Sequence, residues 1–214
     1  MPLDLSALSH YLETKQALTP LEVLGRTLAY NPYAPRLRVQ DLERTQSGPQ
    51  QVLRLDASLE LEVLLEQLER PARALLLDFM PLYTPLPALE SLDLLGYVRR
   101  LSPNPLIHKD YFVDPYQLLE SVVHGGDGVV LSAQLLGAHL KDMCAYASRL
   151  GLLDIVEVRC KADLKAGVLA RASALYLSQD FAALLELTPQ RCVILKDFDS
   201  SHPDDHGVDA LILP

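Results

Sequence analysis

Residues 154–179 read DIVEVRCKADLKAGVLARASALYLSQ. The first and last parts of this stretch are short and apolar, as in strands that are buried on both faces. The residues between them, 161–170, have the composition of a short helix. A strand, a helix and a second strand of these lengths predict a parallel βαβ unit with a right-handed crossover.

The same alternation recurs along most of the chain. Strands are expected at 51–57, 73–79, 105–111, 128–133, 154–160, 174–179, 191–197 and 209–213, and helices at 59–69, 88–100, 115–124, 136–150, 161–170 and 181–187. Eight such units predict an α/β fold of the (β/α)8 TIM-barrel type. A doubly wound open sheet is the alternative, but it would normally show a Gly-rich turn after the first strand, and DASLELE has none.

Two domain-level expectations follow. Residues 1–48 form an N-terminal helical extension, with helical stretches at 5–17 and 19–30, and residues 49–214 form the barrel, as one domain overall. Only FDSSHPDDHG separates the seventh and eighth strands, and the sequence stops as the eighth strand ends, so the last outer helices are expected to be missing or reduced. Apolar residues on the bare flanks of these two strands would then predict a homodimer that buries them.

Composition narrows the class of protein. The chain has 214 residues and a formal net charge of −9, which argues against nucleic acid or an anionic membrane as a partner. The sequence shows neither an apolar run of membrane-spanning length nor a basic leader, so a cytoplasmic protein is expected. The three cysteines lack metal-ligand spacing and are expected to be reduced, mostly buried thiols; neither a metal nor a cofactor is predicted.

Two charged residues stand where a barrel carries its chemistry. Lys109 ends the third expected strand and Glu157 lies in the fifth, among apolar neighbours that make a carboxylate costly without a partner. Both are expected to point into one cavity at the C-terminal mouth of the barrel. Spacing alone leaves two interpretations open: a structural ion pair between the two side chains, or an acid/base pair.

Three segments carry a resemblance to a known family. LIHKDYFVDPYQLLESVVHGGDGVVLSAQLL (106–136) resembles the Lys-Asp-Phe, Asp-Pro-Tyr-Gln and Gly-Ala-Asp segment of indole-3-glycerol phosphate synthase. Residues 150–168 are similar to its Leu-Val-Glu-Val-His segment, and ALYLSQDF (174–181) to its Gly-Ile-Asn-Asn-Arg-Asp-Leu strand end. The resemblance implies a place in tryptophan biosynthesis and a carboxy-lyase reaction that closes an indole ring, with Lys109 as the general acid and Glu157 as the catalytic glutamate. Asp114 is expected to cap the helix after the third strand.

Other parts of the family's site are not matched. Arg54 and Asp56 stand near the family's Glu-x-Lys pair, and its Ser-Pro-Ser loop is absent. The family's strand-six asparagine falls on Leu177 and its arginine on Gln179, while LKDFDSS replaces the phosphate-binding Glu-Ser-Gly-Ile turn. Efficient turnover of the family's phosphorylated substrate is therefore not expected.

Two hypotheses remain. The first is a divergent enzyme of weak or altered activity, and the second is a non-catalytic paralogue that binds a ligand or a protein. In either case a small ligand of the anthranilate or sugar-phosphate kind is expected at the barrel mouth. The further residues expected to line that pocket are Arg54, Asp56, Asp78, Leu131 and Ser178.

Overall fold

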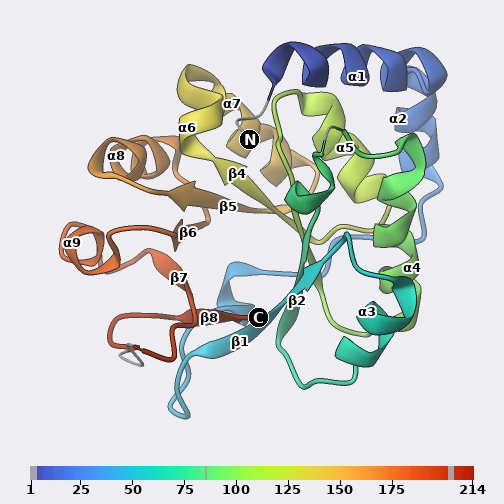
Figure 1. The fold of residues 1–214 in the computed structure, drawn as a ribbon. Helices are drawn as coiled ribbons and strands as arrows, with labels where there is room; N and C mark the ends of the chain where they lie inside the picture. The colour runs from blue at the N-terminus through green and yellow to red at the C-terminus, as the bar shows by residue number, and fades with distance from the viewer. Residues whose placement is uncertain (1–3, 85, 202–204) are drawn as a thin grey trace.

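The strands of the protein close into a single barrel. The computed structural model describes residues 4–84, 86–201 and 205–214. All the strands are parallel and follow one another in chain order, with β8 hydrogen-bonded to β1 (Figure 1). The strands are β1 (Gln50–Asp56), β2 (Ala74–Asp78), β3 (Leu106–Lys109), β4 (Gly128–Ser132), β5 (Leu153–Val158), β6 (Ala174–Leu177), β7 (Val193–Asp197) and β8 (Ala210–Leu213). Each expected strand is present to within two residues at its ends, so the barrel prediction is confirmed and the open sheet is wrong.

Helices surround the barrel and precede it. They are α1 (Leu5–Leu18), α2 (Leu21–Ala29), α3 (Leu61–Gln67), α4 (Asp93–Leu101), α5 (Pro115–Val123), α6 (Ala133–Leu136), α7 (Leu140–Arg149), α8 (Lys161–Ala170) and α9 (Phe181–Leu185). Helix α5 begins where expected, because Pro115 occupies its first position and the Asp114 carboxylate accepts a hydrogen bond from Tyr116 N at 2.8 Å. In the described part of the chain, none of the helices has the length and apolar character needed to cross a membrane.

Alternation along the strands separates two kinds of core. One set of side chains fills the inside of the barrel, including Leu76, Ile107 and Ile155. Their sequence neighbours, such as Leu75 and Val156, belong to the clusters that pack against the outer helices. Because successive side chains of a strand point to opposite faces, this alternation decides which residues can reach the mouth of the barrel.

The N-terminal segment contacts both the outer helices and the inside of the barrel. Helices α1 and α2 lie beside α5 (Figure 1), and Lys15 Nζ pairs with Glu120 Oε2 at 2.7 Å. Leu37 and Leu42, which follow α2, belong to the cluster inside the barrel. Leu37 approaches Gly128 at the start of β4, so this part of the segment closes the end of the barrel opposite its mouth.

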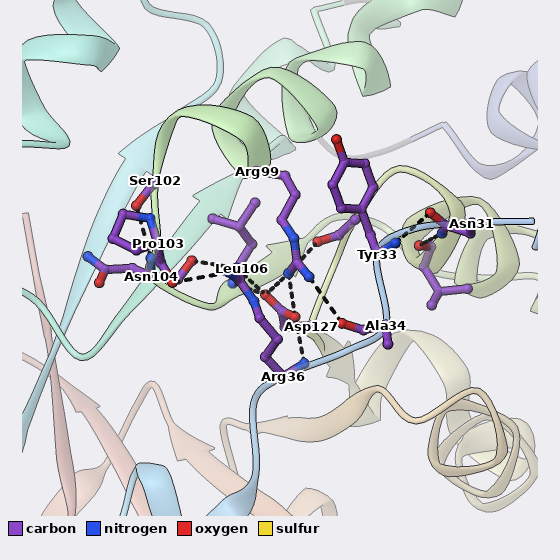
Figure 2. A network of polar contacts seen from close by, with 12 residues as sticks. Asn31, Tyr33, Ala34, Arg36, Arg99, Ser102, Pro103, Asn104, Leu106 and Asp127 are labelled. Carbon is purple, nitrogen blue, oxygen red and sulfur yellow. Dashed lines mark hydrogen bonds and ion pairs between the residues drawn. The ribbon is translucent and has the colours of Figure 1, made fainter.

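A buried aspartate joins this segment to the strands. Asp127 is fully buried and precedes β4. Its carboxylate accepts hydrogen bonds from Arg99 Nη1 at 2.5 Å, Arg36 N at 2.7 Å and Leu106 N at 2.7 Å, and it pairs with the Arg36 guanidinium at 3.2 Å (Figure 2). Arg99 also donates to Ala34 O at 3.0 Å. One carboxylate therefore holds the N-terminal segment, α4 and the first residue of β3 together.

The outer flank of β7 and β8 is less bare than expected. Val, Ile, Leu and Ala were expected to point outward on both strands, but Val193, Leu195, Ala210 and Ile212 lie in the inner cluster. Ile194 does face outward, and it is covered by the cluster that contains Leu184 of α9. A homodimer through this flank stays a prediction, and the structure leaves less apolar surface for it than the sequence indicated.

The Asp127 network gives a test of stability. Asp127→Ala would leave the buried Arg99 guanidinium without its carboxylate, which should lower the free energy of unfolding by about 3–5 kcal/mol in urea titrations. Asp205→Ala is the matched control, because Asp205 pairs with Arg44 at 3.4 Å and both side chains are 38% exposed. That change should cost less than about 1 kcal/mol. Equal losses in the two variants would show that Asp127 has no special role.

The cysteines give a second test. Cys144 is buried, and burial together with the nearby Asp154 raises the pKa of its thiol. Cys160 is exposed, against expectation, because it precedes α8 at the rim of the barrel. Iodoacetamide at pH 8 should therefore alkylate Cys160 in the native protein and Cys144 only after denaturation, as read by peptide mass spectrometry. Modification of Cys144 as fast as Cys160 would contradict this burial.

Candidate functional site

Lys109 lies at the C-terminal end of β3 and points into the barrel mouth. The register places it opposite Asp78 of β2. Its Nζ is 2.7 Å from Asp78 Oδ2, and the two side chains are 12% and 10% exposed. The sequence suggested Glu157 as the ion-pair partner of Lys109, and this interpretation is wrong. Neighbouring strands bring Asp78 to the same level, whereas Glu157 is two strands away.

Glu157 has a different cation beside it. It lies in β5 and is buried, and Arg159 follows it by two residues. Residues two apart on an extended segment share a face, so the Arg159 guanidinium reaches Glu157 Oε2 at 3.1 Å. Arg159 stands where the similar family segment has histidine. It was not proposed as a site residue, although its spacing from Glu157 was a signal that could have found it.

Lys109 and Glu157 line one cavity, as predicted. The cavity has a volume of about 540 Å³. Its walls come from the ends of β2 to β5, the loops that follow them, and the first turn of α1. The lining residues are Leu5, Met80, Lys109, Asp110, Tyr111, Val130, Ser132, Gln134, Leu135, Glu157 and Arg159.

Tyr111 lines the same cavity and interacts electrostatically with charged residues of both ion pairs. Burial raises the pKa of its hydroxyl, and the carboxylate of Asp78 raises it further, while Arg159 opposes the shift and Asp110 and Glu157 add to it. The hydroxyl is therefore a neutral donor at physiological pH. Its ring also packs edge-on against Tyr83 at 4.9 Å between centroids, which holds it at the cavity wall.

The other half of the mouth is filled by a second polar network. Arg54 of β1 donates to Tyr176 Oη at 3.0 Å and to Asp197 Oδ1 at 2.6 Å, and Tyr176 Oη donates to Asp197 Oδ2 at 2.6 Å. Burial raises the pKa of Tyr176, and Asp197 raises it further, so the phenol stays protonated. Arg54 Nε also lies 4.0 Å from Asp78 Oδ2, which links this network to Lys109.

Several expected pocket residues do not line the cavity. Leu131 is fully buried among the outer helices, because alternation turns its neighbours Val130 and Ser132 inward instead. Asp56 accepts hydrogen bonds from the Ser58 amide at 2.8 Å and the Ser58 hydroxyl at 2.6 Å, which makes it part of the turn after β1. Arg54 and Asp78 are at the mouth, but they stand behind the cavity wall in the networks just described.

The residues at the end of β6 do not line the cavity either. Ser178 donates its amide to Val158 O at 3.1 Å and is not part of the cavity wall. Leu177, at the family's asparagine position, packs with the outer helices. In the described residues, the His, Cys, Asp and Glu side chains do not gather in a group of three or more that could hold a metal ion.

The fold and this cavity define the class of protein, a (β/α)8 barrel with charged and apolar residues lining a cavity at its C-terminal mouth. The family model of indole-3-glycerol phosphate synthase matches residues 90–175. Indole-3-glycerol phosphate synthase of Campylobacter concisus is 33% identical over 174 residues, which cover 76% of this chain and 65% of that protein. The Sulfurimonas denitrificans enzyme of that name is 35% identical, over 70% of this chain and 60% of that one. The Campylobacter jejuni strain 81-176 protein of that name is 29% identical, over 94% of this chain and 88% of that one. This protein belongs to the indole-3-glycerol phosphate synthase family, as a distant member.

Solved structures agree on the fold. A mutant tryptophan synthase α-subunit from Pyrococcus furiosus superimposes with a TM-score of 0.61, covering 77% of this chain and 86% of that one. The two sequences are 15% identical, so the likeness concerns the barrel alone. The chain spans less than two thirds of the length of two of the three relatives described above.

Removing the lysine tests whether Lys109 and Asp78 stabilise the protein as a pair. Lys109→Met should lower the free energy of unfolding by about 1–3 kcal/mol, because it leaves the buried Asp78 carboxylate with poorer partners. Lys165→Met, at an exposed position of α8, should have almost no effect. The double variant Asp78→Asn with Lys109→Met should lose less than the sum of the single changes. Strict additivity in chemical denaturation would show that the pair does not act as a unit.

Proposed function

We propose that this protein is an indole-3-glycerol phosphate synthase-like barrel, related to tryptophan biosynthesis, whose carboxy-lyase activity is weak or altered. The observation that carries the proposal is the Lys109–Asp78 ion pair at 2.7 Å. Lys109 takes the position of the family's general acid, and its ammonium group is already engaged by a carboxylate of the neighbouring strand.

This pair weakens a role in proton donation. A general acid has to come within hydrogen-bond distance of the atom that it protonates. Asp78 competes for the Lys109 ammonium, and Asp78 is itself within reach of Arg54. A substrate carbonyl would have to displace a partly buried carboxylate from Lys109 before it received a proton.

The filled half of the mouth supports the same proposal. Arg54, near the position of the family's Glu-x-Lys pair, bridges to Tyr176 and Asp197 across the ends of β1, β6 and β7. Asp197 belongs to the segment that replaces the family's phosphate-binding turn after the seventh strand. A phosphorylated substrate that spans the mouth would meet a carboxylate and a hydrogen-bonded phenol at this place.

A barrel that binds a ligand without catalysis is the second candidate. The specific observation in its favour is that both family-position groups, Lys109 and Glu157, are paired with protein charges. Both candidate functions predict that the barrel binds a ligand, but only the first predicts turnover, so a turnover assay separates them.

Turnover of the anthranilate-derived ribulose phosphate substrate gives the test. Losing one preorganised group costs about 10²–10³ in rate, so turnover should be at most on the order of 0.1 per second, against the roughly 1–10 per second of ordinary enzymes. Lys109→Ala should abolish what remains, and Lys165→Ala should leave it unchanged. Turnover at ordinary enzyme rates would refute the proposal, and complete absence with retained ligand binding would favour the non-catalytic barrel.

A further inference from the structure

The charges on the cavity wall balance one another. Of the described residues that line the cavity, the charged ones are Lys109, Asp110, Glu157 and Arg159, two positive and two negative. Asp78 stands directly behind Lys109 and adds a further negative charge. The described wall therefore offers no excess of positive charge to an anion.

The positive groups are also engaged. Lys109 is held by Asp78 at 2.7 Å and Arg159 by Glu157 at 3.1 Å. An anion that took over either cation would leave a poorly solvated carboxylate without its partner, and that desolvation cost would reduce the affinity. A phosphate dianion would meet this cost at both pairs.

Glu157 and Arg159 can each form further hydrogen bonds while they remain paired with one another. A carboxylate offers about four acceptor sites and a guanidinium five donors, and their mutual hydrogen bond uses one of each. A ligand that presents an ammonium group and a carboxylate side by side could add to the pair without disrupting it. The ammonium would approach Glu157 and the carboxylate would approach Arg159.

The rest of the wall suits an apolar body. Leu5, Met80, Val130 and Leu135 line the cavity, together with the ring of Tyr111. The volume of about 540 Å³ is in the range of small-molecule sites. The neutral polar residues Ser132 and Gln134 complete the wall beside Glu157.

We propose that the mouth cavity selects a small molecule without net charge, namely a zwitterionic amino acid with an aromatic or aliphatic side chain. The proposal deepens the proposed function and rests on it, because it takes the mouth cavity as the ligand site. The Glu157–Arg159 pair is the recognition element for the charged end, and the apolar wall receives the side chain.

A matched set of phenyl compounds tests whether the cavity prefers a ligand without net charge. L-phenylalanine is the zwitterion, 3-phenylpropionate the monoanion, phenethylamine the cation and phenyl phosphate the dianion. Calorimetry on the full chain at one ionic strength should show phenylalanine binding at least about tenfold tighter than the other three. Tighter binding of phenyl phosphate or 3-phenylpropionate would overturn the proposal, and so would the absence of binding by all four at millimolar concentration.

Variants of the pair distinguish recognition from a structural role. Glu157→Gln removes the negative member and should shift the preference to 3-phenylpropionate, whereas Arg159→Met should shift it to phenethylamine. If the pair were merely structural, either substitution would weaken the binding of all four ligands alike, and that result would overturn the proposal. Leu135→Trp narrows the cavity and should weaken the binding of every ligand, which would place the binding site in this cavity.

The outcome stays separate from that of the turnover assay. Fast turnover of the phosphorylated substrate would refute the proposed function, whatever the phenyl compounds do. Slow turnover without selectivity for phenylalanine would refute this inference alone.

Discussion

The Asp127 carboxylate is the interaction on which the arrangement of the mouth depends. A fully buried charge has to be compensated, and Asp127 is compensated by donors that lie far apart in the sequence (Figure 2). One of them is the amide of Leu106, the first residue of β3. Since β3 is four residues long, fixing its start also fixes the height at which Lys109 emerges at the other end. The floor of the barrel and its mouth are thus linked through a single short strand.

The mouth is organised by pairing between strands. Asp78 meets Lys109 because β2 and β3 are neighbours in register, and Arg54 of β1 reaches Asp197 at the end of β7. These contacts leave the open cavity on the side of β2 to β5. The strand ends that carry Lys109 and Glu157 fit the family relationship, while the Arg54–Tyr176–Asp197 network occupies the other half of the mouth.

Much of the fold was predictable from the chain alone. Apolar strand segments, helical segments between them and the Asp114–Pro115 helix start are local signals, and the structure follows them closely. The same local alternation places Val130 rather than Leu131 on the cavity side, because successive residues of β4 face opposite sides of the sheet. The sequence could also predict that Lys109 and Glu157 share a cavity, because the parallel strands of a barrel end at one rim.

The sequence by itself determined the barrel, the family and the identity of two residues at the mouth, since each of these rests on periodicity or on a contiguous motif. Only the tertiary structure decided the partners of those residues. The sequence does not show that Asp78 meets Lys109 or that Arg54 meets Asp197, because these ion pairs depend on strand register and on side-chain reach across the barrel. The charge balance of the cavity, on which the proposed ligand preference rests, follows from that pairing.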